Sequence, residues 1–219
     1  LNTGGVKLVR QEIRNCLYDS NFNKLCVQLT QLPNFRRVWG LPSYKVDEEE
    51  LNNEKLRKNS FFSKMFDIES VLRFFAFRNL DRFSGNIQDF LDRYMSNALK
   101  LKAGDLDIMR TQFELTLNCA VSIYGDAAFR VWIPEHSDSK KVKKAQWSSR
   151  PSINIWDAVM IGLFQNRDSY DVLPSKAESI LERTKELFLS HPTKTFTGAK
   201  STKKDLITKI KLFTELFKA

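Results

Sequence analysis

The sequence contains little glycine or proline, with 8 Gly and 6 Pro in 219 residues. Long stretches lack both residues, which disfavours sheets with frequent turns and favours long helices. No apolar run reaches the roughly 18 residues of a membrane-spanning helix, and no segment has the pattern of a signal peptide. Hydrophobic residues still make up 42% of the chain, including 17 Phe, so we expect a substantial core.

Cysteine and histidine are also scarce. Cys16, Cys26 and Cys119 form no CxxC pair, and we expect them to be buried small hydrophobes of a reducing compartment. The two histidines, His136 and His191, lie far apart and belong to neither an HxxxH nor an HExxH arrangement. These spacings argue against a disulfide framework and against a metal site.

Basic residues outnumber acidic ones, 35 against 26, which gives a formal net charge of +9. This excess suggests an anionic partner, with nucleic acid as the first candidate and an acidic protein surface as the second. An ordinary lysine-rich surface is the third interpretation. The charge therefore bears on partners and solubility and not on the fold.

Apolar residues recur at helical spacing along most of the chain and predict an all-α, irregular multi-helix bundle. In the first predicted helix, Val9, Ile13, Cys16 and Leu17 share one apolar face. Segment 61–79 is too apolar for one narrow stripe, which predicts a central, largely buried helix with a break near its start. The predicted helices cover residues 9–18, 21–32, 35–39, 61–79, 87–102, 106–124, 154–164, 175–190 and 202–217.

Other segments break the helical pattern. Residues 47–58 are predicted to form a charged helix or a solvated link, and residues 193–200 a polar link. Residues 135–150 are polar and predict a mobile basic loop that carries four lysines, Lys140, Lys141, Lys143 and Lys144. The lysines either touch a nucleic-acid backbone or form a solvated loop tip. We expect Trp156 in the core, whereas Trp147, beside the lysines, is the tryptophan to test for base stacking.

The opening turn, Asn2-Thr3-Gly4-Gly5, is the local feature that most suggests a binding site. Two glycines let the backbone approach a ligand closely, and amides near a helix start attract phosphate. The same turn can equally be a structural connection. In the helix that follows, Arg14 can pair with a phosphate or with a carboxylate. Glu12 can hold a metal, position a water or pair with an arginine.

No motif points to a self-sufficient catalytic site. The chain has no GxSxG, no P-loop and no DxD-type metal cluster. An independent enzyme of unfamiliar type remains as a third alternative.

The first eighteen residues carry a family resemblance. LNTGGVKL at 1–8 and QEIRNCLY at 11–18 resemble a segment of the GmrSD-type, ParB-like family of prokaryotic proteins, which are linked to restriction of modified or foreign DNA. Four later segments resemble the helical part of that family more weakly. They are ESVLRFFAFR at 69–78, FLDRYM at 90–95, INIWDA at 153–158 and FTG at 196–198.

The resemblance implies that residues 1–20 are the C-terminal edge of a ParB-like α/β domain and that residues 21–219 form a helical domain. In the family, a DGQQR motif associated with nucleotide hydrolysis or nuclease chemistry lies upstream, and this chain lacks it. We therefore expect a fragment that is inactive alone, within an intact cytoplasmic NTPase or endonuclease that uses NTP and Mg²⁺. Neither histidine has the surroundings of an HNH nuclease domain.

The resemblance also implies partners and a site. The expected partners are DNA and the missing ParB-like domain. Asn2, Thr3, Gly4, Gly5, Arg10 and Arg14 would line one wall of a nucleotide or DNA site, and the four lysines would contact DNA phosphates. The chain departs from the family at Val9 and Arg10, where a capping polar residue and often proline stand, and Val9 cannot cap a helix through its side chain. The alternative is a helical protein–protein interaction module for an acidic partner, with no nucleic-acid role.

Overall fold

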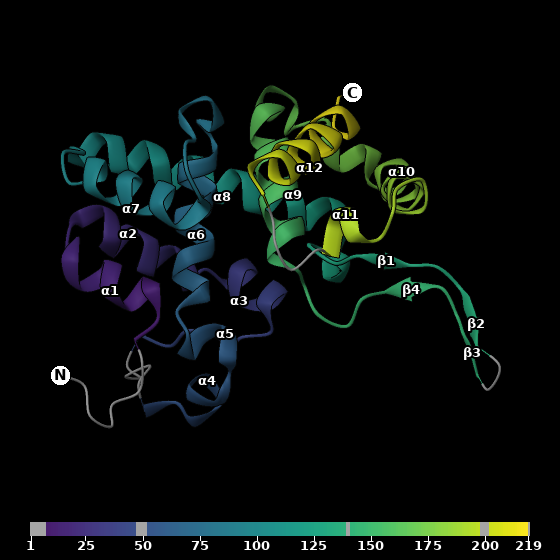
Figure 1. The fold of residues 1–219 in the computed structure, drawn as a ribbon, viewed down its shortest axis with the longest axis horizontal. Coiled ribbons are helices and arrows are strands. Elements are labelled where there is room, and N and C mark those ends of the chain that lie inside the picture. Colours follow the sequence, from purple (N-terminus) through teal and green to yellow (C-terminus); the bar gives the residue numbers. More distant parts are fainter. Residues whose placement is uncertain (1–7, 47–51, 139–140, 198–201, 219) are drawn as a thin grey trace.

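A computed structural model describes residues 8–46, 52–138, 141–197 and 202–218 and confirms the all-α prediction (Figure 1). The N-terminal helices are α1 (Arg10–Leu17), α2 (Asn21–Thr30), α3 (Pro33–Trp39), α4 (Glu54–Lys58), α5 (Ser60–Ser63), α6 (Phe66–Phe77) and α7 (Ile87–Ala98). The C-terminal helices are α8 (Ala103–Tyr124), α9 (Ile153–Gln165), α10 (Ala177–Leu189), α11 (Lys194–Thr197) and α12 (Lys203–Leu216). Short 3₁₀ turns lie at Leu80–Arg82, Gly125–Ala127, Arg167–Ser169 and Leu173–Lys176.

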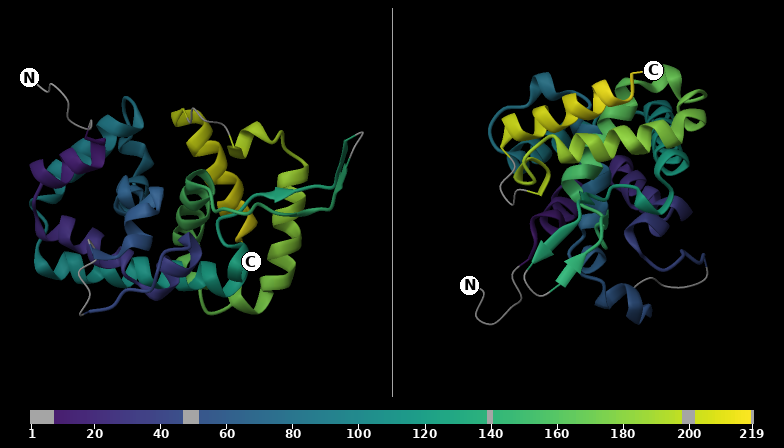
Figure 2. Two further views of the ribbon diagram at one scale, coloured as in Figure 1. Left: turned by 90° about the horizontal axis from the view of Figure 1, so that it is seen from below. Right: turned by 90° about the vertical axis from the view of Figure 1, so that its right-hand side faces the viewer.

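Helix α8 joins two groups of helices. In the left view of Figure 2, α8 runs along both groups. Helices α1, α2, α6 and α7 lie toward one end of α8, and α9, α10 and α12 lie toward the other end. Its inward residues Phe113, Leu117 and Ala120 are fully buried. Because α8 contacts α2, α3, α9 and α10, one continuous core extends through both groups.

Helix α6 lies at the centre, as its apolar sequence predicts. Every residue from Asp67 to Phe77 is buried, between α2, α7 and α9. The predicted break lies at Met65, whose φ of 54° places it in the left-handed region and separates α5 from α6. Trp156 of α9 is fully buried against this core, as predicted, and its indole N–H donates to the carbonyl of Ser70.

Two predicted element boundaries are wrong. Gly104 lies inside α8 and does not separate two helices. The predicted polar link at 193–200 contains the short helix α11, which is held by the fully buried side chain of Phe196 against Phe188. In the segment 47–58, predicted as a charged helix or a solvated link, the described part contains the charged helix α4, which begins after the capping side chain of Asn53, and residues 47–51 lie outside the described part.

The predicted loop at 135–150 is instead a two-stranded antiparallel ribbon that projects from the helical body (Figure 1). Strand β1 (Trp132–Ile133) pairs with β4 (Gln146–Trp147), and β2 (His136–Asp138) pairs with β3 (Lys141–Lys143). At the root, the rings of Trp132 and Trp147 meet edge to face at 5.3 Å, and Trp147 also contacts Phe188 of α10. This aromatic pair fixes the register. The strands are short and polar, so the spacing of apolar residues does not predict the ribbon.

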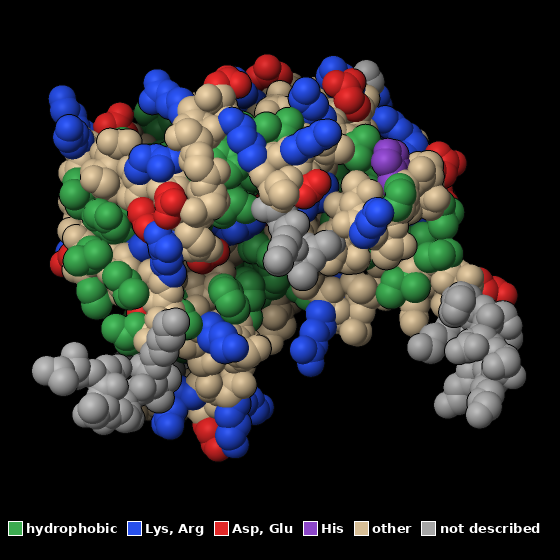
Figure 3. Space-filling model, viewed as in Figure 1, with side chains coloured by type: hydrophobic (Ala, Val, Ile, Leu, Met, Phe, Trp, Pro, Cys, Tyr) green, Lys and Arg blue, Asp and Glu red, His purple; other side chains and the backbone are tan. Residues whose placement is uncertain are grey.

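Helix α1 is oriented opposite to what its pattern indicates. The buried side chains are Gln11 and Arg14, whereas Ile13 is 42% exposed and Leu17 67% exposed. Hydrophobic side chains accordingly gather on the outer flank of the molecule over α1 (Figure 3). Cys16 shares this flank and is exposed, so the prediction that all three cysteines are buried holds for Cys26 and Cys119 only. Polar partners on α6 and α7 cause the reversal.

Candidate functional site

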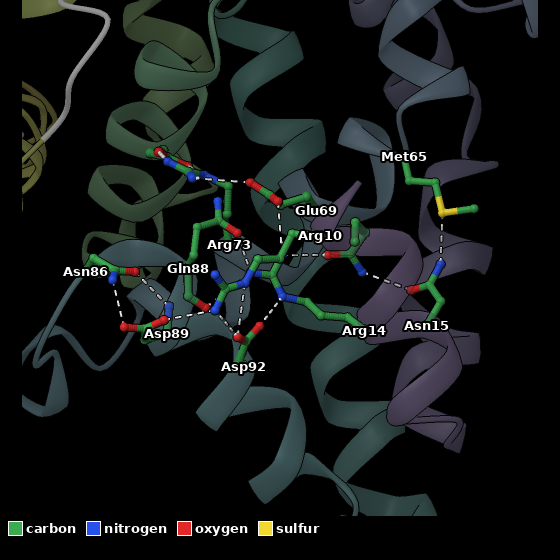
Figure 4. Close-up of polar contacts among 12 residues, drawn as sticks. Arg10, Arg14, Asn15, Met65, Glu69, Arg73, Asn86, Gln88, Asp89 and Asp92 are labelled. Carbon is green, nitrogen blue, oxygen red and sulfur yellow. Dashed lines mark hydrogen bonds and ion pairs between the residues drawn. The ribbon is translucent and has the colours of Figure 1, made fainter. Parts of the chain in front are cut away.

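Arg14 is the centre of a buried ion network between α1, α6 and α7 (Figure 4). Its side chain is 1% exposed. The guanidinium donates to Asp92 through Nε at 2.6 Å and to Glu69 through Nη1 at 3.0 Å. It also donates to the side chain of Gln11 and to the backbone carbonyl of Gln88. Of the two roles that the sequence left open for Arg14, the structure shows the pairing with carboxylates.

The network continues from Glu69 into the C-terminal group of helices. Arg73, one turn further along α6, lies 3.6 Å from Glu69 and donates through Nε to Asp157 at 3.0 Å and through Nη2 to the second oxygen of the same carboxylate. The side chain of Asp157 has no solvent exposure. Such a two-pronged pair fixes the angle between the groups as well as their distance. The chain Arg14–Glu69–Arg73–Asp157 thus ties α1 to α9 through α6.

Arg10 extends the same network to the surface. Its guanidinium, half exposed, contacts Asp92 at 2.6 Å and Asp89 at 2.9 Å, both on α7. Asp92 therefore receives two arginines from consecutive turns of α1. Glu12, between them, accepts a hydrogen bond from the backbone N–H of Val9. The Glu12 carboxylate therefore pairs with a backbone N–H at the start of α1, where the side chain of Val9 cannot form a capping hydrogen bond.

Burial and pairing act in opposite directions on the carboxyls of the network. Burial alone would raise the pKa of Asp92, but the hydrogen bonds from Arg10 and Arg14 outweigh it and hold the pKa below its ordinary value. Complete burial raises the pKa of Asp157, against the attraction of Arg73 and Lys209. Burial likewise lowers the pKa of Lys209, which donates to Asn154 at 3.0 Å.

The lowered pKa of Asp92 predicts an acid-dependent loss of stability. A carboxyl with a depressed pKa in the folded state contributes stability above its unfolded pKa of about 3.9, and this stability disappears as the pH falls through the folded value. We expect Asp92→Asn to flatten the acid limb of the unfolding free energy, measured by urea titration from neutral to acidic pH. Asp107→Asn, at an exposed position of α8, is the control and should leave that limb unchanged. Equal acid limbs in wild type and Asp92→Asn would contradict the assignment.

The inner end of the network reaches a cavity of about 270 Å³. Glu69 and Arg73 line it together with the aromatic rings of Trp39, Phe61 and Phe66. The network is balanced in charge, since the described carboxylates of Asp89, Asp92, Glu69 and Asp157 face the cations of Arg10, Arg14, Arg73 and Lys209. Such an arrangement holds helices in fixed positions and leaves Arg14 little capacity for an external anion.

The other candidate residues lie elsewhere or outside the described part. Asn2, Thr3, Gly4, Gly5 and Lys140 fall outside the described residues. Lys141 and Lys143 belong to β3, and Lys144 is exposed next to it. These lysines are on the projecting ribbon, whereas Arg10 and Arg14 are on α1 in the body (Figure 1). Trp147 is half-buried at the ribbon root, where Trp132 and Phe188 contact its ring.

Sequence reasoning missed the carboxylates that receive Arg14 and Arg73. Glu69 and Arg73 are four residues apart in a largely apolar helix, and Asp157 interrupts the apolar run of α9. Charged residues are rarely fully buried unless they are paired. The isolated charges in two apolar helices were therefore a usable signal for a buried network.

Within the described ranges, no group of three or more His, Cys, Asp or Glu side chains could hold a metal ion. Over the same residues, none of the helices has the length and apolar character needed to cross a membrane. Comparison of the chain with protein-family models, with curated proteins and with solved structures gave no match.

Proposed function

We propose that this chain is the helical portion of a GmrSD-type DNA restriction and anti-phage defence protein. In this proposal it supports the nucleotide- or DNA-binding site of an adjoining ParB-like domain and contacts DNA phosphates, and it is not catalytic alone. The proposal rests on the resemblance of residues 1–18 to that family and on the features of α1 described next.

The orientation of α1 is the observation that carries the proposal. An amphipathic helix normally turns its apolar stripe to the core. Here Leu8, Ile13 and Leu17 remain exposed, while Arg14 is fixed inward by four polar partners. An apolar flank of this kind is typical of an interaction surface. The adjoining ParB-like domain is the occupant that the resemblance of this segment favours.

The DNA-contacting part of the proposal draws on charge. The net charge is +9, and four lysines fall within the five consecutive residues 140–144, a group called the ribbon lysines because it includes Lys141 and Lys143 of β3. Lysines that neutralise phosphates supply affinity without sequence preference, with nonspecific dissociation constants of about 10⁻⁴ to 10⁻⁶ M. We therefore expect weak, sequence-independent binding to duplex DNA.

Replacing the four ribbon lysines with glutamine tests this contact. We expect the affinity for a duplex oligonucleotide, measured by fluorescence anisotropy at low salt, to fall by at least about tenfold, because several phosphate contacts are lost. The control replaces Lys24, Lys100, Lys102 and Lys176, which are exposed on the body, and changes the net charge equally. A similar loss in both variants would show that only overall charge matters.

Hydrolysis by this chain would contradict the proposal that it is inactive alone. We expect no release of phosphate from ATP or GTP in the presence of Mg²⁺. If the chain binds an acidic protein but no DNA at low salt, the interaction-module alternative is favoured instead.

A further inference from the structure

A second, strongly basic cavity lies between the end of α3, the α4–α5 junction and the chain that leads into α9. Its volume is about 570 Å³, within the range of ligand-binding clefts. Arg37, Lys58, Arg130 and Arg150 line it, and among the residues that the structure describes no Asp or Glu belongs to its lining. In Figure 3 the lower edge of the molecule is hollowed between the α4–α5 projection and the ribbon, with Lys and Arg side chains along it.

The cations of this cavity are weakly engaged. Arg37 approaches Asp126 at 3.7 Å, and the side chain of Asp126 is 92% exposed. Lys58 pairs with Glu54 of its own helix, with both side chains about three-quarters exposed. Exposed pairs of this kind contribute little and are easily exchanged. Arg150 has no carboxylate partner among the residues that the structure describes.

Two buried donors of the same lining also lack an acceptor in the described part of the chain. The first is the indole N–H of Trp39, a residue that is only 8% exposed. The second is Nε of Arg130, while Nη1 of that guanidinium donates to the carbonyls of Ser148 and Ser149 at 2.9 Å. A buried donor without an acceptor costs about 1–3 kcal/mol. Both donors belong to residues that line the cationic cavity, so an acceptor bound there is a candidate partner for them.

The floor of the cavity is rigid and apolar. The rings of Trp39 and Phe61 stack at 4.0 Å and 17°, and both also line the adjoining cavity of about 270 Å³. Trp39 further contacts Trp156 of the core at 5.6 Å. The indole N–H is therefore held in a fixed direction, which favours a defined ligand over loosely bound counterions.

We propose that this cavity binds a phosphate group, of a free nucleotide or of a nucleic-acid backbone. Phosphate offers several charged acceptor oxygens, which match forked guanidinium donors better than a single carboxylate does. Trp39 and Arg130 supply the fixed buried donors, and Arg37, Lys58 and Arg150 supply exchangeable positive charge. The assignment does not depend on the ribbon lysines or on membership of any family.

The test uses the indole N–H signals in a two-dimensional NMR spectrum of the ¹⁵N-labelled chain, which contains four Trp. Trp39→Phe keeps an aromatic ring on Phe61 and identifies the Trp39 signal by its loss. We expect inorganic pyrophosphate, added at low ionic strength without metal, to move the Trp39 signal more than those of Trp132 and Trp147. Pyrophosphate that moves no indole signal, or all of them alike, would overturn the proposal.

A charge-matched pair of variants provides the second arm. Arg37→Gln with Arg150→Gln removes two exposed cations of the cavity, and Arg82→Gln with Arg183→Gln removes two exposed cations elsewhere. We expect the first variant to bind pyrophosphate at least about tenfold more weakly and the second to bind as wild type does. Equal affinities in the two variants would overturn the site.

Competition identifies the source of the phosphate. ATP that displaces pyrophosphate while a duplex oligonucleotide does not assigns the cavity to free nucleotides, and the reverse assigns it to a nucleic-acid backbone. Failure of both competitors against bound pyrophosphate would overturn the proposal. The variant that lacks the ribbon lysines should bind pyrophosphate normally, so that a failure of the ribbon contact and a failure of this site are distinguishable.

Discussion

Replacing Arg14 with alanine is expected to destabilise the chain by about 3 kcal/mol or more, because it removes the fully buried cation that Glu69 and Asp92 share. Glu69, whose side chain is 11% exposed, would lose its 3.0 Å contact and retain only Arg73 at 3.6 Å. Asp92 would lose one of its two arginines. The free energy of unfolding from urea titration, with circular dichroism as the probe, measures the effect.

Arg10 provides the matched control for this prediction. It lies one turn away on the same helix and contacts the same Asp92, but its side chain is 49% exposed. Arg10→Ala should therefore change the unfolding free energy much less than Arg14→Ala does. Addition of Glu69→Gln to Arg14→Ala should recover part of the lost stability, since it removes a carboxylate that has lost its nearer partner. Equal effects of Arg10→Ala and Arg14→Ala would contradict the buried network.

The second large effect is expected at Gly162 of α9, which lies directly against the backbone of α12. A Cβ at this position would lie 3.0 Å from the backbone C of Phe213 and from the backbone N of Thr214. Backbone atoms cannot give way as a flexible side chain can, so α12 has to shift. We expect Gly162→Val to cost about 3 kcal/mol or more, at the upper end of overpacking effects, in the same unfolding measurement.

Gly104 is the control for Gly162, because it is also helical but has open space around it. No atom lies within 4 Å of the Cβ that would be added at Gly104. Gly104→Ala should therefore change the unfolding free energy by less than about 1 kcal/mol, since Gly104 is the second residue of α8 and has room for the added methyl group. A neutral or stabilising result for Gly162→Val would mean that α12 is not held against α9 as the structure shows.

The helical fold could be predicted because its signals are local. Apolar residues at helical spacing located α2, α6, α9, α10 and α12 to within a few residues, and Met65 marks a break that the excess of apolar residues already suggested. The ribbon could not be predicted in this way. Its root is held by the contact between Trp132 and Trp147, fifteen positions apart, and by the contact of Trp147 with Phe188 of α10, which no local pattern reveals.

For helix α1, the spacing of apolar residues predicted the wrong buried face. Its apolar face suggested burial, but Arg14 finds Glu69 and Asp92 on two other helices, at sequence separations of 55 and 78. Pairing at such distances is invisible to periodicity. The sequence did place Arg14 among the residues of interest, with a carboxylate partner as one of two alternatives, and the structure shows that alternative.

These ion pairs hold α1, α6, α7 and α9 in fixed positions relative to one another. Arg73 and Asp157 connect α6 to α9, and Arg14 connects α1 to α6 and α7. A helical body held in this way can present the basic ribbon and the apolar flank of α1 to partners without rearranging. The role of a support that binds DNA and does not hydrolyse nucleotides is consistent with this construction.

The salt dependence of DNA binding tests the proposed function most directly. Counterion release predicts that the logarithm of the association constant falls linearly with the logarithm of salt concentration, with a slope of about −0.9 for each phosphate contacted on duplex DNA. We expect a steep slope for this chain between about 50 and 200 mM salt, and a shallower one after the four ribbon lysines are replaced. The absence of any affinity for duplex DNA even at the lowest salt concentration would contradict the proposed function.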